Sequence, residues 1–176
     1  MRRLILVALG LVSLAAVAVG LWMTNRTTAQ PTTAELTGEQ RAAIAEEVNR
    51  LNGEAWDAWR EVDLDRALSY LDDSPDVGFA LEGQVLRGYA ELDAYWREGF
   101  GTASSMDITI SDLRTIVLAA DIVTLVQQGV FSVTDADGVT SPETSFALST
   151  TWVRRDGEWK ILFGHESFPP PEPESM

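Results

Sequence analysis

The stretch Ser149–Phe168, STTWVRRDGEWKILFGHESF, predicts two antiparallel strands joined by a tight turn. Asp156-Gly157 marks the turn, because a two-residue type I′ hairpin needs a positive φ at both central positions. After the turn, alternate residues point to the same face of a sheet. The only histidine of the chain is thereby predicted on an otherwise apolar face, which carries Trp159, Ile161, Phe163, His165 and Ser167.

Two further stretches before this hairpin have the composition of long strands, and they lie at about Met106–Leu118 and Ile122–Thr134. The hairpin itself supplies strands at about Thr144–Val153 and Glu158–Phe168. Short loops between long strands favour an antiparallel meander, because a parallel pair needs a long crossover. We therefore expect four long antiparallel strands in one sheet.

Helical patterns precede these strands. Thr37 with Gln40 has the spacing of a capping box, which predicts the start of a helix of roughly 24 residues. Asp63 is placed to cap a second, shorter helix that continues to Leu71.

A short hairpin and a third helix complete the predicted elements, at Val77–Leu81, Gln84–Arg87 and Gly88–Phe100. The turn of that hairpin is Glu82-Gly83. Helices grouped before one antiparallel sheet are typical of an α+β fold.

The composition excludes several classes of site and partner. The chain has no cysteine, so disulfides, thiolate metal centres and cysteine nucleophiles are excluded. Its formal net charge is −14, and the residues after position 29 hold 10 basic and 27 acidic side chains. Such a surface repels nucleic acid, so we expect no nucleic-acid partner.

The N-terminus predicts a membrane segment. Leu4–Met23 is a run of 20 residues without a charge, and Arg2 and Arg3 precede it. As a helix this run spans a hydrocarbon layer of ~30 Å, and the leading arginines favour a cytoplasmic N-terminus. An uncleaved signal anchor and a cleaved signal peptide both remain open. Either one places the rest of the chain outside the cytoplasm, in the cell envelope or secreted.

The predicted organisation has four parts. Residues 1–29 form the signal anchor or signal peptide, and residues 30–36 form a linker. Residues 37–168 form the folded domain. Residues 169–176 form a tail rich in proline and glutamate, which we expect to be disordered.

The order of these elements resembles the nuclear transport factor 2-like superfamily, and within it the SnoaL-like and ketosteroid-isomerase-like domains. The resemblance implies a cone in which a curved antiparallel sheet wraps the N-terminal helices and leaves an apolar pocket. It also implies a homodimer through the outer sheet face. The matching motifs are Trp56 and Trp59, Asp63-Leu64-Asp65, Tyr70-Leu71-Asp72-Asp73, Leu86-Arg87-Gly88, the run 152–161 and His165-Glu166-Ser167.

The residues of ketosteroid isomerisation are not matched. That reaction uses an aspartate base, a tyrosine and a protonated aspartic acid. Phe79 stands at the position of the base, and Glu54 or Ala55 at that of the tyrosine. The strand Thr144–Val153 contains no acid. We therefore expect no ketosteroid isomerase activity.

His165 is the candidate for acid–base chemistry or for a pH-sensitive ligand contact, because imidazole titrates near neutral pH. A hydrogen-bonded histidine at the rim of the core is the alternative interpretation. Aromatic residues are candidates for the wall of an apolar ligand pocket, or else for the core. These candidates are Trp56, Trp59, Tyr70, Phe79, Trp96, Trp152 and Phe163.

No metal site or cofactor is predicted. The stretch Asp135–Gly138 has two acids, but its glycine position does not fit a calcium loop, so we interpret it as a turn. The preferred function is a tethered or exported module that binds a small apolar or amphipathic molecule, or that dimerises. The alternative is a lyase, isomerase or hydrolase that pairs His165 with a carboxylate such as Glu54 or Asp57.

The location is testable with a reporter enzyme that is active only in the cytoplasm, fused after Met176. We expect the reporter to be silent, because Leu4–Met23 would carry Met176 across the membrane. Deleting Leu4–Met23 should restore its activity. Full activity of the undeleted fusion would contradict the predicted location.

Overall fold

A computed structural model of the chain describes residues 35–169. The predicted segment 1–29, almost all of the linker and residues 170–176 of the tail lie outside these described residues. Within residues 35–169, no helix is both long enough and apolar enough to cross a membrane.

The helices begin where their capping residues predict. Helix α2 covers Gly38–Arg60, and Thr37 caps it: the Thr37 hydroxyl accepts from the Gln40 N–H at 3.2 Å, and the Gln40 side chain accepts from the Thr37 N–H at 2.9 Å. Helix α3 covers Leu64–Leu68, and Asp63 is its N-cap residue. The predicted capping box is therefore confirmed.

Helix α3 is shorter than predicted, because the chain after it pairs with the sheet. The Ile161 N–H donates to the Tyr70 carbonyl at 2.7 Å, and the Asp72 N–H donates to the Ile161 carbonyl at 2.9 Å. These two bonds hold Leu71 in a parallel bridge with Ile161, which a continued helix would not allow.

One six-stranded sheet contains all the strands, in the order β2-β1-β6-β5-β4-β3. Helix α4, Tyr89–Phe100, follows the β1–β2 hairpin. The strands are β1 (Gly78–Leu81), β2 (Gln84–Arg87), β3 (Ala103–Ala119), β4 (Ile122–Asp135), β5 (Thr144–Arg155) and β6 (Glu158–Ser167).

One pairing differs from the expected antiparallel sheet, because β1 runs parallel to β6. No hairpin joins these two strands. Strand β1 instead follows the segment that already pairs in parallel with Ile161, so it continues in the direction of β6. The α+β class and the remaining antiparallel pairs are confirmed.

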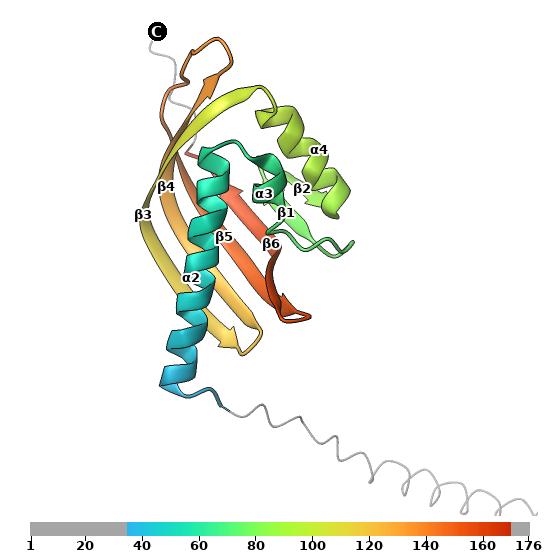
Figure 1. The fold of residues 1–176 in the computed structure, drawn as a ribbon, viewed down its shortest axis with the longest axis vertical. Helices are drawn as coiled ribbons and strands as arrows, with labels where there is room; N and C mark the ends of the chain where they lie inside the picture. Colours follow the sequence, from blue (N-terminus) through green and yellow to red (C-terminus); the bar gives the residue numbers. More distant parts are fainter. Residues whose placement is uncertain (1–34, 170–176) are drawn as a thin grey trace, which may run out of the picture. The chain divides into compact units, whose positions relative to one another are not determined.

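The sheet curves around α2, with α3 and α4 beside its β1–β2 end (Figure 1). Strand β3 has 17 residues and three register shifts against β4. Bulges of this kind bend and twist a strand, which accounts for the curvature of the long hairpin. The concave face of the sheet therefore carries most of the core.

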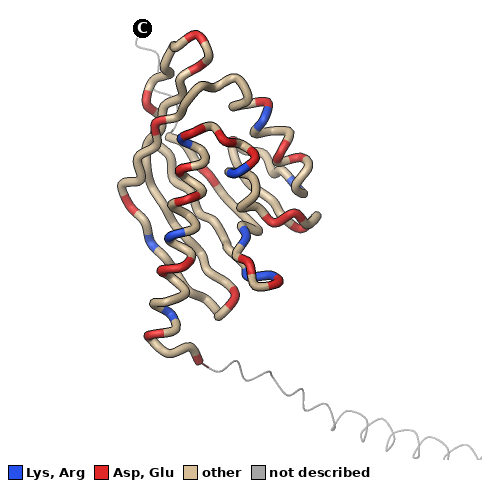
Figure 2. The backbone as a smooth tube through the Cα atoms, in the orientation of Figure 1, with Lys and Arg blue, Asp and Glu red and all other residues tan. Residues whose placement is uncertain are grey.

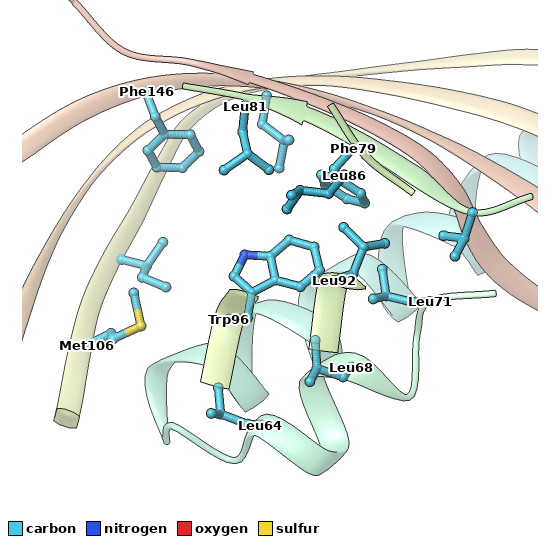
Figure 3. Packing of buried hydrophobic residues seen from close by; sticks show 13 residues of the cluster. Leu64, Leu68, Leu71, Phe79, Leu81, Leu86, Leu92, Trp96, Met106 and Phe146 are labelled. Carbon is cyan, nitrogen blue, oxygen red and sulfur yellow. The ribbon is translucent and has the colours of Figure 1, made fainter. Parts of the chain in front are cut away.

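The core consists of two clusters. One packs α3 and α4 against the sheet, and Figure 3 shows the Trp96 indole reaching from α4 into the space between Phe79 on the sheet and Leu68 on α3. The Phe79 and Trp96 ring centroids lie 5.0 Å apart at 84°. The second cluster lies between α2 and the sheet and contains Val48, Val123, Leu125, Trp152 and Trp159.

The predicted face of β6 is correct only in its first half. Trp152 pairs with Ile161 and Thr151 pairs with Phe163, so Leu162 is an extra residue without a partner on β5. An extra residue moves every later side chain to the opposite face. Trp159 is 4% exposed, whereas Phe163 is 44% exposed. The predicted burial of Phe163 and the predicted inward placement of His165 are therefore wrong.

Gly164 permits this arrangement and provides a test of it. A Cβ on Gly164 would lie 2.0 Å from a ring atom of Phe79. Gly164→Ala should lower the free energy of unfolding by about 1–3 kcal/mol, the usual cost of overpacking. The measurement is urea unfolding of the full chain, followed by tryptophan fluorescence.

The matched control is Gly53→Ala in α2, where a new Cβ meets no atom within 4 Å. Because alanine is the better helix former, this control should raise the unfolding free energy by up to about 1 kcal/mol. Equal effects at both positions would contradict the close approach of Phe79 to Gly164.

Candidate functional site

An apolar cavity of about 120 Å³ lies between the helices and the concave face of the sheet. Helix α2 supplies one wall, α3 and α4 supply a second, and strands β1 and β3 to β6 supply the third. The lining side chains are mostly aromatic or aliphatic, and they include Trp56, Trp59, Leu68, Leu71, Phe79, Trp96, Phe100, Met106, Ile108, Phe131, Phe146, Leu148, Ile161 and Phe168.

Four of the predicted pocket residues line this cavity: Trp56, Trp59, Phe79 and Trp96. Trp59 and Trp96 meet edge to face, with centroids 5.7 Å apart at 65°. Trp56 lies 5.7 Å from Phe146 on β5. These contacts join α2 and α4 to each other and to the sheet around the cavity.

The other three predicted pocket residues lie elsewhere. Trp152 is fully buried in the second core cluster, and the Tyr70 ring packs against it at 6.4 Å. Phe163 points away from the cavity because of the extra residue Leu162. Sequence spacing identified these residues as apolar, but it did not separate the core from the cavity wall.

A small polar network lies behind one wall. The Asn52 and Gln127 side chains exchange two hydrogen bonds, of 2.9 and 3.1 Å, and the Trp56 Nε1–H donates to Gln127 at 2.9 Å. Thr150 accepts a bond from the Trp152 Nε1–H at 3.1 Å. Asn52 and Thr150 both border the cavity, and their bonds keep these buried polar groups satisfied.

Glu166 is the only ionisable side chain among the residues that line the cavity. Burial, followed by the nearby negative charge of Glu82, raises the pKa of Glu166 from 4.5 to about 7. Within residues 35–169, Glu166 has no ion pair and no hydrogen-bond partner for its side chain. The cavity therefore contains an acid that titrates close to neutral pH.

Glu82 and Tyr95 lie beside this acid. The Tyr95 hydroxyl donates to a Glu82 carboxylate oxygen at 3.1 Å. Burial and this hydrogen bond raise the pKa of Tyr95 to about 12, with further contributions from the charges of Glu82 and Glu166. Tyr95 is therefore a neutral donor at neutral pH, and Glu82 is its acceptor.

His165 and Glu166 have exchanged the faces that regular alternation predicts. His165 is exposed on the outer face of the sheet, whereas Glu166 borders the cavity. The sequence contained a signal for this exchange. Three consecutive apolar residues, Ile161 to Phe163, do not fit strict alternation, and a glycine within a strand often marks a bulge or a close backbone approach.

The other acids considered with His165 do not approach the cavity. Glu54 is exposed and pairs with Arg50 at 2.6 Å, and Asp57 is exposed and pairs with Arg60 at 2.7 Å. Phe79 and Ala55, the residues at two positions of the ketosteroid-isomerase chemistry, are buried and apolar.

Residues 35–169 contain no cluster of three or more His, Asp or Glu side chains that could hold a metal ion. The Asp135 carboxylate accepts from the Asp137 and Val139 N–H groups, both at 2.9 Å. These bonds belong to a turn, as predicted for this loop.

The family description "SnoaL-like domain" matches residues 48–171, which include the residues that line this cavity. The chain belongs to this family. Its fold is that of the nuclear transport factor 2-like superfamily. Among curated proteins, none matches this SnoaL-like chain.

Solved structures share the fold at low sequence identity. A putative dehydratase from Streptomyces avermitilis is 16% identical, with a TM-score of 0.65 over 74% of this chain and 99% of that one. A type 2 hexachlorocyclohexane dehydrochlorinase is 17% identical, with a TM-score of 0.61 over 75% and 89%. The association domain of CaMKII from C. elegans is 14% identical, with a TM-score of 0.59 over 74% and 99%. Their different names show that this fold does not fix one function.

The titration of Glu166 should appear in the pH dependence of stability. Between pH 4.5 and about 7 the folded protein keeps a proton that the unfolded chain has lost. The unfolding free energy therefore has its full contribution from Glu166 below pH 4.5. This contribution decreases as the pH rises from 4.5 and is lost above about pH 7. Glu166→Gln should remove this decline and make the variant more stable than the parent at about pH 8.

The measurement is urea unfolding at several pH values. Glu143→Gln is the matched control, because it removes the same charge at an exposed position before β5 and should keep the decline. Parallel curves for the parent and Glu166→Gln would contradict the raised pKa.

Proposed function

We propose that this SnoaL-like domain binds a small, mainly apolar molecule in the cavity. The observation that carries the proposal is the aromatic-lined volume of about 120 Å³. An engineered cavity of about 150 Å³ in another protein binds benzene, so this space is suited to a ligand part of about one ring. Ligand sites are typically apolar concavities with a few polar groups, which here are Asn52, Thr150 and Glu166.

A second candidate function is proton transfer by Glu166. A carboxyl group with a pKa near the working pH is suited to general acid–base catalysis. Two structural neighbours are named as a putative dehydratase and a dehydrochlorinase. This candidate replaces the alternative based on His165, because His165 lies outside the cavity and Glu54 and Asp57 do not line it.

We also propose where the domain is located and how it assembles. The uncharged run Leu4–Met23 supports a position outside the cytoplasm, either anchored or secreted. A homodimer through the outer sheet face is supported by Val126 and Phe163, which expose 43% and 44% of their surface. Both proposals are compatible with a ligand cavity on the concave side.

Cavity binding is testable with benzyl alcohol as a neutral probe. The six tryptophans of the full chain can be labelled with fluorine and observed by ¹⁹F NMR in lipid nanodiscs. Saturable shifts of the Trp56 and Trp59 signals are expected, because both rings line the cavity. Leu148→Phe places a larger ring in the wall and should weaken binding at least tenfold.

Phe163→Ala is the matched control. It changes an aromatic residue on the outer face of β6 and should leave the dissociation constant within about twofold of the parent value. Unshifted Trp56 and Trp59 signals at saturating probe, or equal binding by Leu148→Phe, would contradict a ligand in this cavity.

A further inference from the structure

We propose that the cavity selects ligands that carry a positively charged amine on a small apolar body. This inference rests on the proposed function, because it names the chemical class that the same cavity prefers. The shape and the apolar walls of the cavity alone would accept a neutral, a cationic or an anionic ligand of the same size.

The charged group in the cavity lining is acidic. Glu166 is the only ionisable residue in the lining, and Glu82 lies close enough to influence it. No lysine or arginine lines the cavity. An anionic ligand would therefore enter a space of low dielectric constant opposite a carboxylate, which is unfavourable, whereas an ammonium group would gain an ion pair there.

Two arginines on helices that line the cavity are already engaged. Arg60 on α2 donates two bonds to the Ile108 carbonyl and pairs with Asp57. Arg97 on α4 pairs with Asp65 and Asp93. Neither guanidinium is left to neutralise Glu166, so a cation supplied by a ligand would meet a carboxylate without a partner among the described residues.

Aromatic rings line the same cavity. The Phe79 ring covers Gly164, and Phe168 lines the cavity two residues beyond Glu166. Ring faces attract ammonium groups, with a larger effect where water is excluded. The amine would therefore contact a carboxylate and at least one ring, while its apolar body occupies the rest of the aromatic-lined cavity.

Proton balance links binding to pH. A protonated amine pairs with ionised Glu166, so binding releases the Glu166 proton where that group is still protonated. The other titratable groups near Glu166 are Glu82 on the β1–β2 turn and Tyr95 on α4, and Tyr95 stays protonated at neutral pH. The preference for the amine should therefore grow as the pH rises through about 7.

The whole surface supports the same selection. The chain has a formal net charge of −14, and Figure 2 marks acidic residues along the helices and in the loops between strands. Such a surface raises the local concentration of cations and lowers that of anions.

The test uses three probes with one ring and similar size: benzylamine, benzyl alcohol and benzoate. Their dissociation constants would be measured on the full chain in nanodiscs from the Trp56 and Trp59 fluorine signals, at about pH 6 and pH 8. At pH 8 we expect benzylamine to bind at least tenfold more tightly than benzyl alcohol, and benzoate to bind most weakly. At pH 6 the preference for the amine should be several-fold smaller.

Single-residue variants test which side chains cause the preference for benzylamine. Glu166→Gln should abolish the preference for benzylamine, and saturable shifts of the Trp56 and Trp59 signals by benzyl alcohol should persist because the apolar walls are unchanged. Glu82→Gln keeps an acceptor for Tyr95 and should reduce the preference partly. Glu143→Gln removes an exposed charge outside the cavity lining, and His165→Gln removes the exposed imidazole next to Glu166 in the sequence, so both should retain the full preference and its pH dependence.

The outcomes separate the two proposals. Binding of benzyl alcohol without a preference for benzylamine, or a preference that survives Glu166→Gln, overturns the amine selectivity and leaves the cavity function standing. Tighter binding of benzoate overturns it in the same way. Failure of all three probes to shift the Trp56 and Trp59 signals overturns both.

Discussion

The close approach of Phe79 to Gly164 determines what the cavity contains. Strand β1 lies parallel to β6, and its Phe79 ring occupies the space that any side chain at position 164 would need. Leu162 is the extra residue that brings Gly164 to the inner face. Once Gly164 faces inward, Glu166 must do so as well, because side chains alternate along a strand. A single extra residue therefore places an acid in the cavity and a histidine outside.

The position of Glu166 has an energetic cost that packing does not explain. A carboxyl group taken out of water without a partner favours its neutral form, and a negative neighbour adds to that effect. The domain keeps such a group although other buried polar side chains, such as the Asn52–Gln127 pair, are hydrogen-bonded. Uncompensated polar groups of this kind tend to gather at functional sites, where stability is given up for binding or chemistry.

The elements of the fold could be predicted from the sequence because their signals are local. The capping box at Thr37 and the positive φ of Asp156 and Gly157 need only neighbouring residues. The inner face of β6 could not be predicted by alternation, because the bulge depends on β1, a strand some 80 positions earlier. For the same reason aromatic spacing could not separate Trp152 in the core from Trp96 at the cavity. Membrane insertion and location stay predictions.

The cavity belongs to only one of the two core clusters. Val48, Leu125 and Trp152 belong to the cluster between α2 and the sheet, and none of the three lines the cavity. The cavity lies in the other cluster, and its walls come from α2, from α3 and α4, and from strands β1 and β3 to β6. Solved structures at 14 to 17% identity retain this fold while carrying unrelated names. Proteins that share this fold can therefore differ in the residues that line the cavity. The chemical class of a ligand has to be inferred from individual groups such as Glu166, because the fold alone does not specify it.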